Sequence, residues 1–209
     1  MPELLQASLL TLFALSSAVS IGMARRGYGE PDQPALFCPL LAFSLAAGTG
    51  TCAMARLVFG LNTLEAERWL LQATLLLGLP LVGVTALTLS RKWIWSRPTW
   101  GRLVIGLCAF FELARQLDWS APYAFSLGLL SALLVAYAGL LQWPARLQVA
   151  AGVAGGALML TLLPWSGLPL GNNPLGEYQQ LCLALASPII AWLLLNLPGN
   201  LREERRAPA

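Results

Sequence analysis

The chain has 209 residues, of which 57% are hydrophobic and only 11% are charged. With a mean hydropathy of +0.65, it is too apolar for a soluble globular domain of this length and is predicted to be an integral membrane protein. Its net charge of +3 is too small to indicate nucleic-acid binding, and the absence of histidine excludes histidine-based zinc sites, histidine-ligated haem and a Ser-His-Asp triad.

A membrane-spanning helix needs about 20 mainly apolar residues. Seven such runs, separated by short polar breaks, cover most of the chain. We therefore predict an all-α integral membrane protein in which residues 1–209 form a single bundle of seven transmembrane helices. The predicted spans are residues 5–24, 35–58, 69–90, 103–117, 123–142, 147–165 and 178–197.

The charges around the first span indicate a retained helix. Glu3 precedes the span and no Lys or Arg does, whereas Arg25 and Arg26 follow it. A cleaved signal peptide has basic residues before its apolar region, so we expect this helix to remain, with the N-terminus outside.

Basic residues near span ends predict which side is cytoplasmic. With seven spans, ten of the 13 basic residues lie on the cytoplasmic side, Arg68 lies outside, and Arg56 and Arg115 lie within spans. This predicts a cytoplasmic C-terminus, with residues 198–209 as a short charged cytoplasmic tail. The ten residues are Arg25, Arg26, Arg91, Lys92, Arg97, Arg102, Arg146, Arg202, Arg205 and Arg206.

The fourth predicted span is the weakest, because Glu112 and Arg115 interrupt its apolar run. The alternative is a six-span topology in which this segment lies on the membrane surface. That topology moves Arg146 and the three tail arginines outside, so four more basic residues lie on the wrong side than with seven spans. We therefore favour seven spans.

Charged residues within an apolar run are unusual, and three of them lie in or just after this fourth span. Glu112, Arg115 and Asp118 are spaced by three, so each lies on the same helical face as the one before. An ionised group near the bilayer centre costs about 2.5–3.5 kcal/mol, so these side chains should face protein or water and find partners.

Candidate partners occur at the same level of other spans. They are Arg56, Glu65, Glu67, Arg68, Glu177, Tyr178, Gln179 and Gln180. We predict that the charges converge at the outer face and that the ligand-binding residues are Arg56, Glu67, Glu112, Arg115, Asp118 and Glu177. A purely structural interpretation stays open, in which Glu112 pairs with Arg115 or Arg56 to hold helices together and the other charges are solvated.

Three classes of function fit this pattern. The first is a membrane protein that binds a ligand, a lipid head group or a partner protein through the polar cluster. The second is a metal-free intramembrane enzyme that uses Glu112 as acid and base on a lipid or isoprenoid substrate. The third is a small transporter, which is disfavoured because seven spans do not divide into two equal halves. Carboxylates paired with arginines would favour recognition or structure, and an isolated buried carboxylate would favour catalysis.

Other features predict contacts. Gly152 and Gly156 form a GxxxG pair, which favours packing within the bundle or, alternatively, a homo-oligomer. Pro80 and Pro188 should kink the third and seventh spans. We expect no metal and no cofactor.

The loop RKWIWSRPTW and Arg102 interleave basic residues with tryptophans. This pattern could bind anionic lipid, although positive-inside charge and an aromatic belt also explain it. Membrane lipids are thus expected partners, and nucleic acid is not. One lysine beside twelve arginines is typical of a GC-rich bacterial genome, which suggests a bacterial inner membrane.

Overall fold

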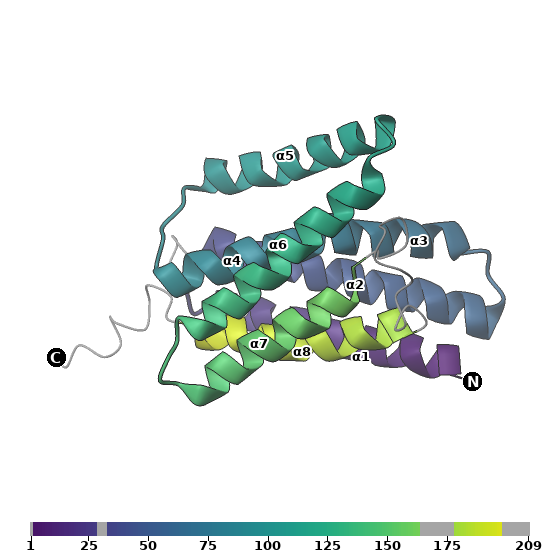
Figure 1. Cartoon of the computed structure of the whole chain (residues 1–209). Helices are drawn as coiled ribbons and strands as arrows, with labels where there is room; N and C mark the ends of the chain where they lie inside the picture. The colour runs from purple at the N-terminus through teal and green to yellow at the C-terminus, as the bar shows by residue number, and fades with distance from the viewer. Residues whose placement is uncertain (1, 29–32, 164–177, 198–209) are drawn as a thin grey trace.

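The computed structural model describes residues 2–28, 33–163 and 178–197, and every regular element in these ranges is a helix. The rod formed by α3, η1 and α4 is continuous, so these ranges contain seven helical rods, each overlapping one predicted run. Consecutive rods run in opposite directions (Figure 1). The elements are α1 (Pro2–Arg25), α2 (Gln33–Phe59), α3 (Leu64–Ala73), η1 (Thr74–Gly78), α4 (Leu79–Arg91), α5 (Arg97–Gln116), α6 (Ser120–Leu140), α7 (Arg146–Thr161) and α8 (Gln179–Asn196).

Five stretches within these rods are long and apolar enough to cross a membrane, namely Glu3–Arg25, Gln33–Phe59, Leu64–Arg91, Pro122–Leu140 and Gln179–Asn196. The all-helical prediction is confirmed, and these five helices agree with a membrane protein. Helix α7 has 16 residues, about 24 Å at 1.5 Å per residue, and is therefore shorter than a hydrocarbon core of about 30 Å. Helix α5 carries Glu112 and Arg115. Seven spans therefore remain a prediction.

The rods pack as a bundle with one loosely attached member. Helix α1 lies against α2 and α8, while α6 lies against α4 and α7, and α7 also contacts α8. Helix α5 stands at the edge, with its main contacts to α6, η1 and α2 (Figure 1). Large aliphatic side chains such as Leu10, Leu81 and Leu194 are completely buried between the rods.

Small residues let neighbouring helices approach closely. A Cβ added at Gly50 on α2 would lie 2.5 Å from the Thr11 Oγ1 atom on α1, and one added at Gly139 on α6 would lie 2.6 Å from the Gly152 Cα atom on α7. Gly156 also packs against α6, with an added Cβ 2.8 Å from the Ala132 carbonyl oxygen. The expected packing of the glycine pair within the bundle is therefore present. A contact between copies through these glycines stays a prediction and would have to displace α6.

The third rod changes its helical repeat just before Pro80. Proline lacks an N–H and its ring displaces the carbonyl one turn earlier, so an undisturbed α-helix cannot continue through it. Here the five residues of η1 form a π-helical turn, and the Leu79 N–H donates to the Thr74 carbonyl oxygen. A π-turn beside a proline is a known cause of helix bending.

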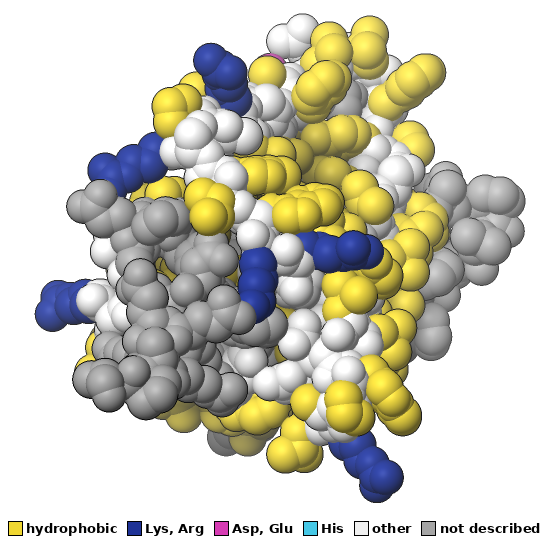
Figure 2. Space-filling model, turned by 90° about the vertical axis from the view of Figure 1, so that its left-hand side faces the viewer, with side chains coloured by type: hydrophobic (Ala, Val, Ile, Leu, Met, Phe, Trp, Pro, Cys, Tyr) yellow, Lys and Arg dark blue, Asp and Glu magenta, His cyan; other side chains and the backbone are white. Residues whose placement is uncertain are grey.

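The charges separate toward the two ends of the bundle. One end, which we call the basic end, carries Arg25 and Arg26 at the end of α1, Arg91 and Lys92 at the end of α4, Arg97 at the start of α5 and Arg146 at the start of α7. Figure 2 shows the molecule from this end. Among its coloured side chains, Lys and Arg are prominent, whereas Asp and Glu are scarcely visible. Glu3 and the start of α3 lie at the opposite end (Figure 1).

Candidate functional site

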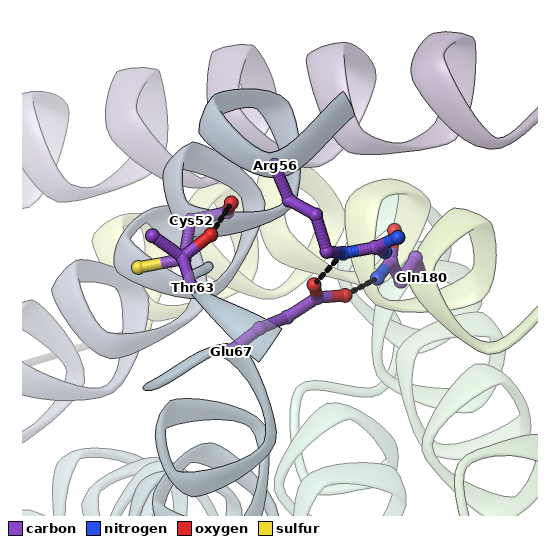
Figure 3. A network of polar contacts seen from close by, with 5 residues as sticks. All are labelled: Cys52, Arg56, Thr63, Glu67 and Gln180. Carbon is purple, nitrogen blue, oxygen red and sulfur yellow. Dashed lines mark hydrogen bonds and ion pairs between the residues drawn. The ribbon is translucent and has the colours of Figure 1, made fainter. Parts of the chain in front are cut away.

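A hydrogen-bonded charge network joins three helices at the end opposite the basic end. The Arg56 Nε–H donates to the Glu67 Oε2 atom at 3.0 Å, which forms an ion pair, and the Gln180 Nε2 atom donates to Glu67 Oε1 at 3.1 Å. Figure 3 shows Arg56 and Gln180 converging on this carboxylate from α2 and α8. Only 10% of the Glu67 side chain is exposed, against 32% for Arg56. Both carboxylate oxygens therefore have donors where water has little access.

The connection between α2 and α3 positions Glu67. Gly60 has a φ of +64°, a left-handed conformation that glycine adopts without a steric penalty, and it lets the chain turn back after α2. The Thr63 Oγ1 atom donates to the Cys52 carbonyl oxygen at 2.8 Å, which ties the start of α3 to α2 (Figure 3). Glu67 then lies in the first turn of α3, where the helix dipole favours a negative charge.

A cavity of about 310 Å³ opens beside this network, between α1, α2, α3 and α8. Its polar side chains include both donors and acceptors, and its apolar wall comes from α2 and α3. The lining residues are Glu3, Gln6, Ala53, Arg56, Leu57, Leu71, Gln179 and Gln180.

The network leaves binding capacity in the cavity. Arg56 bonds Glu67 through Nε, and neither of its Nη groups donates a hydrogen bond to another residue in the described ranges. Gln179 is anchored by donating to the Leu162 carbonyl oxygen at 3.3 Å. Glu3 is exposed and supplies a carboxylate on the side formed by α1. The cavity can thus accept a group that carries both an anionic oxygen and a cationic or hydrogen-bond-donating atom.

The structure brings together only part of the predicted cluster. Arg56 and Glu67 meet as expected, and Gln179 and Gln180 join them from α8. Glu112 lies on α5, where its Oε1 atom accepts a hydrogen bond of 3.2 Å from Gln116 on the same helix.

Three predicted residues belong elsewhere or fall outside the description. Asp118 is exposed in the turn after α5, with a φ of 56°. The backbone of Arg115 lies on α5, but its side chain is outside the described part of the structure, as is the whole of Glu177. Because α5 packs at the edge of the bundle and Glu112 does not line the cavity beside the Arg56–Glu67 pair, its binding or catalytic role stays a prediction.

Sequence reasoning missed Glu3 and Gln6 as members of the site. Both stand in the first two turns of α1, and only the packing of α1 against α2 and α8 brings them to the cavity. The sequence did contain a signal for them. Glu3 and Gln6 place a carboxylate and an amide at the predicted outer end of the first span, just as Glu177 and two glutamines do at the start of the seventh span.

The pairing of Glu67 bears on the choice between recognition and catalysis. Its carboxylate is neutralised by Arg56 and hydrogen-bonded by Gln180, an arrangement that suits structure or recognition better than proton transfer. In the ranges 2–28, 33–163 and 178–197, no three His, Cys, Asp or Glu side chains gather in a way that could hold a metal ion.

Comparison with protein-family models, with curated proteins and with solved structures finds no significant match.

Proposed function

We propose that this protein is a small polytopic protein of a bacterial inner membrane that binds the polar head group of an amphiphilic ligand at its outer face. The supporting observation is the cavity beside the Arg56–Glu67–Gln180 network, which combines a positioned guanidinium, three glutamines and a carboxylate with an apolar wall. In this proposal the chain crosses the membrane seven times, with the N-terminus outside and the C-terminus in the cytoplasm.

The separation of charge supports this orientation. The basic end carries Arg25, Arg26, Arg91, Lys92, Arg97 and Arg146, and positive charge is retained preferentially on the cytoplasmic side. The cavity lies at the other end, between the start of α1 and the start of α8, which corresponds to the outer leaflet.

The chemistry of the cavity favours a zwitterionic head group. The Nη groups of Arg56, which donate to no other residue in the described ranges, suit a phosphate oxygen, because charge-assisted hydrogen bonds from guanidinium to phosphate are strong and directional. The Glu3 carboxylate suits an ammonium group, and the glutamine amides can donate or accept. Leu57 and Leu71 provide apolar surface for the adjoining carbon chain.

Binding of phosphatidylethanolamine to the purified full chain, measured by native mass spectrometry, tests this function. Gln6→Leu and Gln179→Leu remove polar atoms from the cavity without touching the ion pair, and each should weaken binding about five- to ten-fold, the cost of one lost hydrogen bond in a partly buried site. Glu65→Gln is the matched control, because Glu65 is exposed and does not line the cavity. Equal binding by all three variants and the wild type would exclude the cavity as the site.

A further inference from the structure

A second cavity, of about 640 Å³, lies at the basic end, far along the rods from the proposed outer site. It is open to the surface and is lined by the last turn of α1, the first turns of α2 and the first turns of α5. The residues that matter most for its chemistry are Arg25, Phe37, Arg97, Trp100, Gly101 and Ile105.

Two arginines from different helices supply the charge of this cavity. The Arg25 Nε–H donates to the Gln33 carbonyl oxygen at 3.1 Å, and its guanidinium carbon lies 5.4 Å from the centre of the Phe37 ring. These contacts orient the guanidinium while its Nη groups make no hydrogen bond within the described ranges. Arg97 is exposed at the start of α5, and neither arginine has an ion pair with a described carboxylate.

Apolar surface continues from the arginines along the bundle. Phe37 on α2 is 46% exposed and Ile105 on α5 is 69% exposed, so both present hydrocarbon surface outward. Trp100 is 4% exposed and packs against Trp95 with ring centroids 5.2 Å apart, which gives the cavity a fixed wall. A charged mouth followed by an apolar wall matches a ligand with an anionic head and a hydrocarbon tail.

We propose that this cavity binds an anionic glycerophospholipid of the inner leaflet, with the phosphate between Arg25 and Arg97 and an acyl chain along Phe37 and Ile105. The proposal is independent of the outer site but uses the same membrane orientation. General attraction of basic residues to an anionic surface would involve all arginines at this end about equally. Binding in the cavity instead predicts that Arg25 and Arg97 contribute more to lipid affinity than arginines outside it.

The first experiment compares charge removal inside and outside the cavity. The purified full chain is titrated with phosphatidylglycerol, and the bound fraction is measured by native mass spectrometry. Arg25→Gln combined with Arg97→Gln should weaken binding roughly 20- to 30-fold, because each basic residue near an anionic lipid contributes about five-fold. The matched control, Arg26→Gln with Arg146→Gln, removes the same charge from exposed positions at the same end and should cost less than about five-fold in affinity.

The second experiment fills the cavity while both arginines remain. A Cβ added at Gly101 meets no atom within 4 Å, and Gly101 lines the cavity, so Gly101→Leu places a side chain in the space proposed for lipid. Gly106 on the same helix is equally open but does not line the cavity, which makes Gly106→Leu its control. Because leucine favours helix over glycine, neither variant should impair folding. We expect Gly101→Leu to lower phosphatidylglycerol affinity at least about five-fold and Gly106→Leu to leave it unchanged.

Several results would overturn the proposal. Equal losses in the two double-arginine variants would indicate diffuse attraction, and wild-type affinity in Gly101→Leu would show that the cavity is not the lipid site. Displacement of phosphatidylglycerol by inorganic phosphate as effectively as by competing lipid would assign the arginines to a soluble anion. If either double-arginine variant fails to fold, the two glycine variants decide the question. Retention of phosphatidylethanolamine at the outer site in Gly101→Leu separates this test from that of the proposed function.

Discussion

Replacing Arg56 by methionine should destabilise the protein more than replacing its partner by glutamine. Arg56→Met leaves Glu67, which is 10% exposed, with Gln180 as its described donor. Breaking a fully buried ion pair by removing one partner costs about 3–5 kcal/mol, and an exposed pair contributes about 0–1 kcal/mol. Because Arg56 is 32% exposed, solvent screens part of the loss, and we expect the free energy of unfolding to fall by about 2 kcal/mol.

Glu67→Gln should cost only about 1 kcal/mol, because a glutamine oxygen can still accept from Arg56 and no charge is left unpaired. The double variant removes both charges, so no buried carboxylate remains, and it should lose about 1.5 kcal/mol rather than the sum of the single losses. The expected coupling between the two positions is therefore about 1.5 kcal/mol.

Reversible unfolding of the four proteins in mixed detergent micelles, after removal of bound lipid, measures these free energies. Glu65→Gln is the control for loss of a carboxylate from the same helix, and it should change stability by less than about 0.5 kcal/mol because Glu65 is exposed. Losses in the double variant that equal the sum of the single losses would show that Arg56 and Glu67 do not act as a pair, which would refute the assignment of a structural role to their contact.

Three further predictions concern packing, orientation and the edge helix. Gly152→Leu should lower the free energy of unfolding by about 2–3 kcal/mol because α6 lies against Gly152, whereas Val153→Leu, at an exposed position, should change it by less than about 0.5 kcal/mol; similar values for both would contradict the close approach of α6 and α7. A reporter fused to the C-terminus should be active only in the cytoplasm, and activity only outside would reverse the orientation. Glu112→Gln should leave phosphatidylethanolamine binding within about two-fold of wild type, because Glu112 does not line the outer cavity; a loss comparable to that of Gln179→Leu would bring α5 into the binding site.

The helical architecture follows from local properties of the sequence. A backbone in hydrocarbon must satisfy its own hydrogen bonds, so long apolar runs form helices wherever they occur, and each predicted run overlaps a rod of the structure. The antiparallel order follows from the short polar breaks, and the charge asymmetry follows from that order, since residues such as Arg25 and Arg91 are then brought to the same end.

The membership of the candidate sites depends on packing between rods, which local patterns do not encode. The sequence predicted that Arg56, Glu67 and Glu112 lie at a similar depth along the bundle axis. Depth along the axis does not determine on which side of the bundle each residue lies. Packing of α8 against α1 brings Gln180 to Glu67 and adds Glu3 to the outer cavity, while the edge position of α5 puts Glu112 in another environment.

The cavity at the basic end illustrates the same division. Arg25 and Arg97 were recognisable from sequence as basic residues near span ends, and as such they predicted orientation alone. Their shared cavity exists because the start of α5 lies beside the end of α1 and the start of α2. Amino-acid composition and periodicity thus determined that this protein is helical and suited to a membrane. Only the tertiary structure decided which charges meet, because the azimuth of each helix is set by side-chain packing with its neighbours.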